Sequence, residues 1–237
     1  MEGKTIIDSL LKFSLTRQEA TVYHRLLLYG KQTGYEISKA TGISRSNVYS
    51  SLASLTEKGA AYVVEESAKK YMPVPLNEFC SNCIKVMENE KNWLLKNIET
   101  KKDNTESYIT IEGENNILNK AKNLLSSAEE RAYISCSADT LNLIEDEISC
   151  LIDKNLRVVI LTDSTYALSG ATVYKTDFKG NQIGIITDSK YVLTGEYGAG
   201  SANTCLYSGQ KNFVLLFKTA LSNEIKLIQY TKGVQTK

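Results

Sequence analysis

Residues 38–59 read SKATGISRSNVYSSLASLTEKG, and this stretch decides the fold of the first third of the chain. Gly42 lies where a first helix must end, because glycine adopts the left-handed conformation after a helix at little cost. Ser44 follows as a good N-cap for a second helix, since its hydroxyl can accept a backbone N–H of the first turn. Two helices joined by so short a turn indicate a helix-turn-helix.

The second helix of this stretch has two unlike faces. Val48, Leu52 and Leu55 recur at spacings of four and three residues, which predicts one buried stripe. The opposite positions carry short or hydrogen-bonding side chains and a single charge, whereas a merely solvated face usually holds Lys and Glu. Such a face suits a helix that lies against base-pair edges and phosphate oxygens. The candidate DNA-contacting residues are Arg45, Ser46, Asn47, Tyr49 and Ser50.

The residues that precede this stretch predict further helices. The pattern indicates one helix over residues 4–13, a second between the capping box Thr16–Glu19 and Gly30, and a third that starts at Thr33 or Gly34. The residues expected on the inner face of the second helix are Ala20, Tyr23, Leu27 and Leu28.

The residues that follow it predict a β-hairpin, with strands over residues 61–64 and 70–74. Three helices and a hairpin make a winged helix-turn-helix, whose wing can touch the DNA backbone beside the recognition helix. Lys69 and Lys70 lie at the wing, where they either contact phosphates or are ordinary surface lysines. The predicted DNA-binding domain covers residues 1–75.

After Pro75 the sequence predicts one long helix over residues 76–102. Its apolar residues recur close to a heptad repeat, over about 24 residues without a helix breaker. The repeat consists of Leu76, Phe79 or Cys80, Cys83, Met87, Glu90, Leu94 and Ile98, and Trp93 adds a large apolar side chain. Since a small domain offers such a helix no partner, we expect two chains to pair through residues 76–100. The alternative is a connector that lies on the C-terminal domain of its own chain.

The thiols predict no metal site. Cys80 and Cys83 lie near one face of the long helix, but four ligands would require a second chain, and no histidine or basic cluster is nearby. We interpret the pair as packing in the helix seam. The single histidine, His24, is expected to be a partly exposed polar residue. Five cysteines in a chain of 237 residues indicate reduced thiols and a cytoplasmic protein.

The sequence has no sign of a membrane-spanning segment or a signal peptide, and its charge distribution weakly favours an anionic partner. Residues 1–102 carry 15 Lys and Arg against 11 Asp and Glu, and residues 103–237 carry 13 against 16. A mildly basic first part is consistent with nucleic acid. No apolar run approaches the ~18–20 residues that span a bilayer, and the first residues do not have the pattern of a signal peptide.

The remainder, residues 103–237, predicts an α/β sheet domain after a polar linker at 103–107. The expected strands are 108–111, 131–135, 156–161, 182–187, 191–194, 205–207 and 212–217. The expected helices are 114–127, 138–152 and 221–228. The predicted fold class is therefore α/β multidomain: a winged helix-turn-helix, a long dimerisation helix and a C-terminal sheet domain.

The sequence resembles the TrmB-type transcriptional regulators. The resemblance lies in Leu15 to Tyr23, Gly42 to Tyr49, Leu52, Leu55, Lys58-Gly59 and Tyr71 to Pro75. It implies a winged helix, a dimerising helix and a phospholipase-D-like effector domain, and it implies a dimeric regulator that binds double-stranded DNA and responds to a small molecule such as a sugar. No cofactor is implied.

The C-terminal domain departs from the phospholipase-D-like enzymes at the residues that carry their chemistry. Those enzymes carry His-x-Lys-x4-Asp, with a glycine seven residues after the aspartate. The best register places Asp188 and Gly195 at the last two positions, but Asn181 and Ile183 where histidine and lysine belong. Because the histidine is the nucleophile and the lysine holds the phosphate, we expect a regulator and no enzyme.

A fold that has lost its nucleophile usually keeps the concavity in which its substrate lay. The residues expected at this effector site are Asn181, Asp188, Ser201 and Asn203. The open alternative is that the C-terminal domain binds no effector and serves only to support the dimer. Two other functions also remain open: a phosphodiesterase or nuclease that retains activity, and a winged helix that makes only protein–protein contacts.

Overall fold

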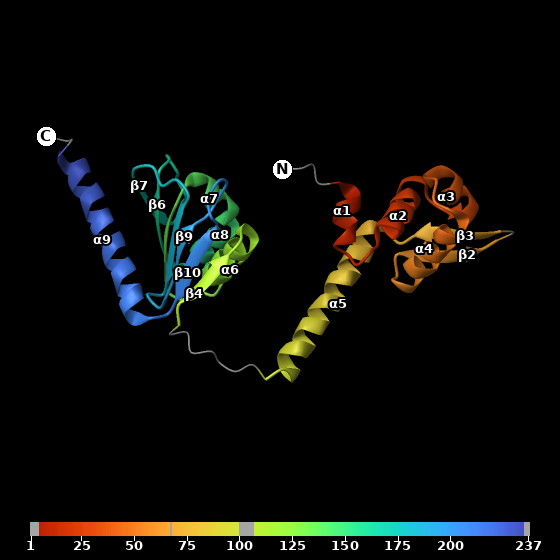
Figure 1. Cartoon of the computed structure of the whole chain (residues 1–237), viewed down its shortest axis with the longest axis horizontal. Helices are drawn as coiled ribbons and strands as arrows, with labels where there is room; N and C mark the ends of the chain where they lie inside the picture. The colour runs from red at the N-terminus through yellow and green to blue at the C-terminus, as the bar shows by residue number, and fades with distance from the viewer. Residues whose placement is uncertain (1–4, 67, 100–106, 235–237) are drawn as a thin grey trace. The chain divides into compact units, whose positions relative to one another are not determined.

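The computed structural model describes residues 5–66, 68–99 and 107–234. The chain divides into two compact units, Met1–Lys101 and Lys102–Lys237 (Figure 1). Each unit has a hydrophobic core of its own. The finer boundaries expected at residues 75 and 102 stay predictions. The linker expected at 103–107 lies outside the described residues except for Ser107.

The described part of the N-terminal unit is a winged helix-turn-helix followed by a long helix, as the sequence predicts. Its elements are α1 (Ile6–Leu11), α2 (Arg17–Tyr29), β1 (Gln32–Thr33), α3 (Gly34–Thr41), α4 (Arg45–Glu57), β2 (Ala61–Glu65), β3 (Lys69–Pro73) and α5 (Leu76–Asn97). The strands form an antiparallel sheet in the order β1-β3-β2. Strand β1 was not expected, because two residues are too few to show an alternating pattern.

Local capping explains where the first helices begin and end. The Thr16 hydroxyl accepts the Glu19 backbone N–H, and the Glu19 carboxylate accepts the Thr16 N–H at 2.8 Å, which confirms the predicted capping box. Gly42 ends α3 in the left-handed conformation at φ 74°. The Ser44 hydroxyl caps α4 by accepting the Asn47 N–H at 3.3 Å.

The inner face of α2 is formed by Ala20, Tyr23 and Leu26, which are fully buried. Leu28 was expected on this face, but it is 61% exposed. The expectation followed the apolar character of the residue, whereas the helical period turns position 28 toward solvent.

Tyr23 joins α2 to the start of α5. Its hydroxyl donates a hydrogen bond to the Val74 carbonyl at 2.8 Å, and its ring meets the Phe79 ring edge-on with centroids 5.2 Å apart. Burial raises the pKa of the Tyr23 hydroxyl, so it stays a neutral donor at every physiological pH. This side chain therefore fixes where the long helix leaves the domain.

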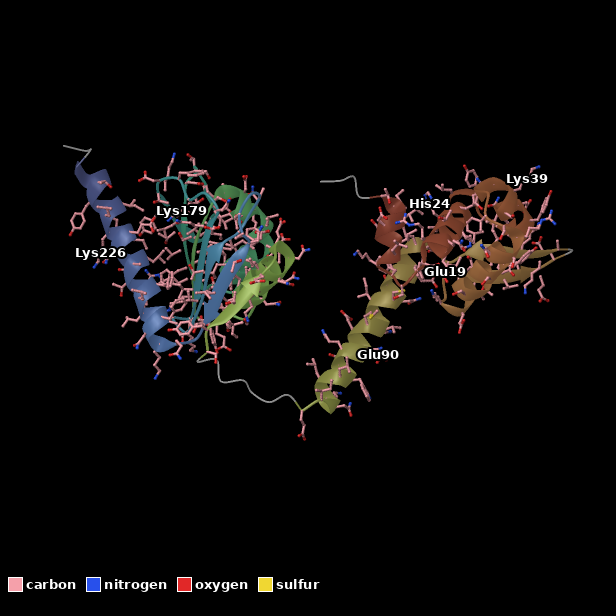
Figure 2. The ribbon with its side chains drawn as sticks, viewed as in Figure 1. Glu19, His24, Lys39, Glu90, Lys179 and Lys226 are labelled. Carbon is pink, nitrogen blue, oxygen red and sulfur yellow. The ribbon has the colours of Figure 1, made fainter. Side chains whose placement is uncertain are left out.

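Glu19, labelled in Figure 2, joins the beginning of α2 to the end of α4. Its carboxylate is buried and accepts the Lys58 ammonium at 2.7 Å, and the same ammonium donates to the Ser14 carbonyl at 2.8 Å. Burial alone would raise the pKa of Glu19. The hydrogen bonds from Lys58, Ser54 and the Thr16 backbone outweigh that effect and lower the pKa to about 2.

The described part of the C-terminal unit is a mixed α/β sheet domain. Its elements are β4 (Ile109–Glu112), α6 (Glu114–Ser126), β5 (Arg131–Cys136), α7 (Ala138–Leu143), α8 (Glu145–Asp153), β6 (Arg157–Thr162), β7 (Ala171–Lys175), β8 (Gln182–Thr187), β9 (Tyr191–Glu196), β10 (Thr204–Ser208) and α9 (Lys211–Val234). The strand order is β4-β10-β9-β8-β5-β6-β7. Strands β5, β6 and β7 are parallel, and the other pairs are antiparallel.

Helices cover both faces of this sheet (Figure 1). Helices α6 and α8 pack on one face and bury the larger core, which includes Ile117, Ile134 and Ile148. Helix α9 crosses the other face, where Val214 packs with Ile186 and Val192. Among the described residues, no helix combines the length and the apolar character that crossing a bilayer requires.

The strand expected at residues 212–217 is wrong, because these residues begin α9. A short apolar run fits a strand and a buried helix equally well by its periodicity. In the structure Val214 is buried, whereas Leu215 and Leu216 are 62% and 63% exposed. The helix expected over 138–152 is divided at Ile144, and β7 was not expected.

Replacing Lys58 with methionine should lower the free energy of unfolding by about 1.5–3 kcal/mol at pH 7, because the buried Glu19 carboxylate loses a charged partner. Since the pKa of Glu19 falls from 4.5 to about 2 on folding, its contribution is full above about pH 5 and is lost as the pH falls toward 2. Urea unfolding should therefore show a difference that shrinks below pH 4. Lys39→Met, at an exposed position, is the control, and an equal loss in both variants would contradict this account.

Candidate nucleic-acid interface and C-terminal hollow

The outer face of α4 presents its five DNA-contacting candidates to solvent. The exposed residues of this face are Arg45, Ser46, Asn47, Tyr49 and Ser50. Val48, Leu52 and Leu55 on the inner face are fully buried. The helix therefore has a rigid apolar back and a polar front, which is the geometry of a helix that enters a major groove.

Arg45 lies beside an aromatic side chain that sequence reasoning missed. Its guanidinium carbon lies 4.6 Å from the centroid of the Tyr35 ring, which is half-exposed on α3. The contact restricts the guanidinium while leaving its N–H groups available to bases or phosphates. The sequence did offer one sign of this contact, because Tyr35 is a large aromatic residue that lies outside the apolar stripe of α3.

The Tyr49 ring lies directly on Gly34, the first residue of α3. A Cβ at position 34 would stand 2.7 Å from two carbons of that ring. Gly34 has no left-handed backbone, so the ring and not the chain conformation is what the glycine accommodates. Helix α3 thus determines where Tyr49 lies on the outer face of α4.

The two wing lysines differ in their surroundings. The Lys70 ammonium pairs with the Glu66 carboxylate at 2.9 Å, and Lys31 pairs with the same carboxylate. The Lys31 and Lys70 ammonium groups lower the pKa of Glu66 to about 2, so the pair is ionised at neutral pH. Lys69 is exposed, and its nitrogen lies 5.9 Å from the centroid of the Tyr71 ring.

Helix α5 extends from the winged helix-turn-helix with a broad exposed apolar surface. Its exposed apolar side chains are Leu76, Ile84, Val86, Met87, Trp93, Leu94 and Leu95. A hollow of about 280 Å³ lies between Phe13 and this helix, beside Cys83, Ile84 and Met87. Cys80 and Cys83 are half-buried against the core of the winged helix, and burial raises the pKa of both thiols.

The positions that correspond to the phospholipase-D-type chemistry carry no catalytic pair. Asn181 is exposed just before β8, and Ile183 is buried in the core on the α6 side of the sheet. The only histidine of the chain, His24, belongs to the N-terminal unit. The structure thus offers neither a nucleophile nor a phosphate-holding lysine at these positions.

Asp188 does not lie with the other three effector-site candidates, because it follows β8 while Asn181 precedes it. Its carboxylate accepts the backbone N–H groups of Glu129, Glu130 and Arg131 at 2.8–3.0 Å. Burial acts to raise the pKa of Asp188, but these three hydrogen bonds lower it below the ordinary value. We therefore assign Asp188 a structural role and leave it out of the effector site.

Asn181, Ser201 and Asn203 do lie together, around the turn that follows β9. The Asn203 side chain accepts the Gly198 N–H at 2.9 Å and donates to the Gly198 carbonyl at 3.2 Å. The Ser201 hydroxyl donates to the same carbonyl at 2.9 Å. Asn203 thus shapes this turn, and a hollow of about 500 Å³ lies beside Asn181 and Ser201.

Two family models match the chain. Residues 10–77 match the model described as sugar-specific transcriptional regulator TrmB, and residues 93–214 match that of the EBD N-terminal subdomain of the transcriptional regulator TrmB. The first match runs from the end of α1 through the wing, and the second covers most of the described sheet domain.

Two proteins are similar in sequence over much of the chain. YrhO of Bacillus subtilis, described as uncharacterized, is 23% identical over 97% of this chain and 87% of its own length. TrmBL1 of Pyrococcus furiosus, described as an HTH-type sugar sensing transcriptional regulator, is 26% identical over 70% of this chain. The chain spans about half of the TrmBL1 sequence, 49% of its length.

The similar solved structures include the following two, both with low TM-scores. TrmBL2, described as an archaeal chromatin protein, has a TM-score of 0.47 and 20% identity over 93% of this chain and 97% of its own. NucT from Helicobacter pylori has a TM-score of 0.38 and 15% identity over 51% of this chain and 97% of its own. The assignment rests on the family models, one of which alone matches more than half of the chain. The chain belongs to the TrmB family of DNA-binding transcriptional regulators.

Proposed function

We propose that the protein is a sequence-specific regulator that inserts the outer face of α4 into the major groove of its operator. The observation that carries this proposal is that all five hydrogen-bonding candidates on α4 are exposed on one rigid helix. Arg45 would donate to a base edge from its position beside Tyr35, and Lys69 and Lys70 would contact backbone phosphates from the wing.

We propose further that two copies pair through residues 76–100. The exposed apolar residues of α5 support this, because such a surface on a soluble helix normally marks an interface. Two recognition helices set about one DNA turn apart, ~34 Å, would then bind a pseudo-palindromic site.

The third part of the proposal is that a small molecule, such as a sugar, alters DNA binding through the C-terminal unit. The hollow beside Asn181 and Ser201 supports it, with hydrogen-bonding groups at its rim. The ligand must bind the DNA-competent and incompetent states with different affinity, since otherwise it regulates nothing. A shift of the operator dissociation constant by sugars, measured by fluorescence anisotropy, tests this part.

Arg45→Ala should weaken operator binding by about 1–3 kcal/mol and relax the preference at one base pair, because one bidentate base contact is lost. Lys69→Ala should weaken binding to all sequences alike and lower the salt slope by about one, because one phosphate contact is lost. Anisotropy titrations at two salt concentrations, on the protein's own upstream region and on random DNA, separate the two effects. Lys154→Ala, in the C-terminal unit, is the control; no preference of the wild type for any upstream fragment would refute the proposal.

Gly34→Ala should weaken operator binding through Tyr49, because the new methyl group must displace the Tyr49 ring. The fold should survive, since the ring is the far end of a flexible side chain and alanine favours a helix over glycine by about 0.5–1 kcal/mol. A double-mutant cycle with Tyr49→Ala provides the control. If Gly34→Ala costs as much affinity without the ring as with it, the effect does not pass through Tyr49.

Met87→Glu should convert the dimer to a monomer at micromolar concentration, because a carboxylate would be buried in the helix seam. Lys85→Glu places the same charge two residues away, on the far side of α5, and should leave the dimer intact. Sedimentation measures the assembly. Trp93 is the only tryptophan and is exposed in a single chain, so its emission should shift to the blue as the wild type dimerises. A wild type that stays monomeric would rule out the pairing.

A further inference from the structure

A groove runs beside α9, on the face of the sheet that this helix crosses. Its volume is about 490 Å³, within the range of small-molecule sites. It adjoins the hollow at Asn181, and Lys179, Gln182 and Glu196 line both. The groove itself lies over β8 and β9, and none of Asn181, Ser201 and Asn203 lines it.

The floor of the groove is made of small residues in register across three strands. Ser135 of β5 is paired with Gly184 of β8, and Gly184 with Thr194 of β9. A Cβ at Gly184 would meet no atom nearer than 3.8 Å, and Gly184 has no positive φ. The glycine is therefore not required by the backbone, and its missing side chain leaves the floor open.

One end of the groove is apolar. Phe217 and Leu221 of α9 form its wall, and Ile186 and Val192 lie below them on the sheet. Because aromatic and aliphatic groups face each other across this end, it suits a compact apolar body.

The other end carries charge that is only partly compensated. The Lys179 ammonium, on a side chain that is 10% exposed, pairs with the Glu224 carboxylate at 2.6 Å, and the Thr176 hydroxyl donates to the same oxygen at 2.8 Å. The backbone N–H of Lys179, a residue labelled in Figure 2, donates to the Asp163 carboxylate at 3.0 Å. This hydrogen bond holds the lysine in place. Lys179 is thus already neutralised by α9.

Glu196 is the remaining charge at this end, and Gln182 is its register partner across the strands. Within the described part of the chain, no lysine or arginine forms an ion pair with Glu196. Two carboxylates and one ammonium leave a net negative charge, which attracts a cation and repels an anion of the same shape.

We propose that this groove binds a small organic cation, an amine carried on a compact apolar body. The ammonium group of the ligand pairs with the Glu196 carboxylate and donates to the side-chain carbonyl of Gln182. The apolar body of the ligand packs on Phe217 and Leu221, over the open floor at Gly184. This proposal does not depend on the sugar response proposed above, although Gln182 and Glu196 line both cavities. Because the ligand would contact both the sheet and α9, its binding would hold that helix on the sheet.

Three probes of one shape test the proposal on the full chain: 2-phenylethylamine, 2-phenylethanol and phenylacetate. Isothermal titration should show the amine binding about three- to tenfold more tightly than the alcohol, with the acid weakest. This preference should shrink as salt is raised, because the mouth of the groove is open to solvent. A thermal shift that follows the same order gives a second readout.

Two variants locate the binding. Glu196→Gln should remove the preference for the amine and leave the alcohol unchanged, whereas Glu114→Gln, an exposed carboxylate on α6, should change neither. Gly184→Val should abolish binding of all three probes by filling the floor, while the melting temperature without ligand shows that the variant folds. Three outcomes would each overturn the proposal. They are tight binding of phenylacetate, amine binding that Gly184→Val leaves unaltered, and a wild type that shows no saturable binding of the amine.

Discussion

The hydrogen bond from the buried Tyr23 hydroxyl to the Val74 carbonyl is the constraint on which the N-terminal unit depends. It closes the wing strand onto α2 just before the chain turns into α5, and Phe79 packs on the same ring. A buried Val74 carbonyl without a donor would cost about 1–3 kcal/mol. The Tyr23 hydroxyl therefore also fixes the position of the chain where α5 begins. The exit of the long helix thus follows from one side chain of α2.

The helix-turn-helix could be predicted because its signals are local. Thr16, Gly42 and Ser44 each act within three or four residues of themselves, and a single sequence contains everything that such caps need. The period of Val48, Leu52 and Leu55 fixed the buried side of α4 in the same way. What the local pattern could not contain is Tyr35 beside Arg45, because that contact depends on how α3 crosses α4.

The C-terminal unit was predicted in outline, and its candidate site only in part. Alternation of strands and helices revealed the sheet, but an apolar run at 212–217 has no unique period, so packing on the sheet decided for a helix. The alignment with the enzyme motif placed Asp188 in the site because it is close to Asn181 in sequence. In the structure the whole of β8 lies between the two residues, so they are at opposite ends of that strand. The pairing of Lys179 with Glu224 joins residues 45 positions apart, which no local pattern reveals.

The wing carries a further consequence for how the protein finds its target. Glu66 compensates both Lys31 and Lys70, so the tip presents less uncompensated positive charge than its lysines suggest. Attraction to arbitrary duplex grows with the number of phosphates neutralised, and competing genomic sites vastly outnumber the operator. Because Glu66 neutralises part of the positive charge of the wing, non-specific binding to random DNA sequence should be weaker. If α4 reads bases as proposed, the choice of a binding site then depends more on base recognition than on bulk electrostatic attraction.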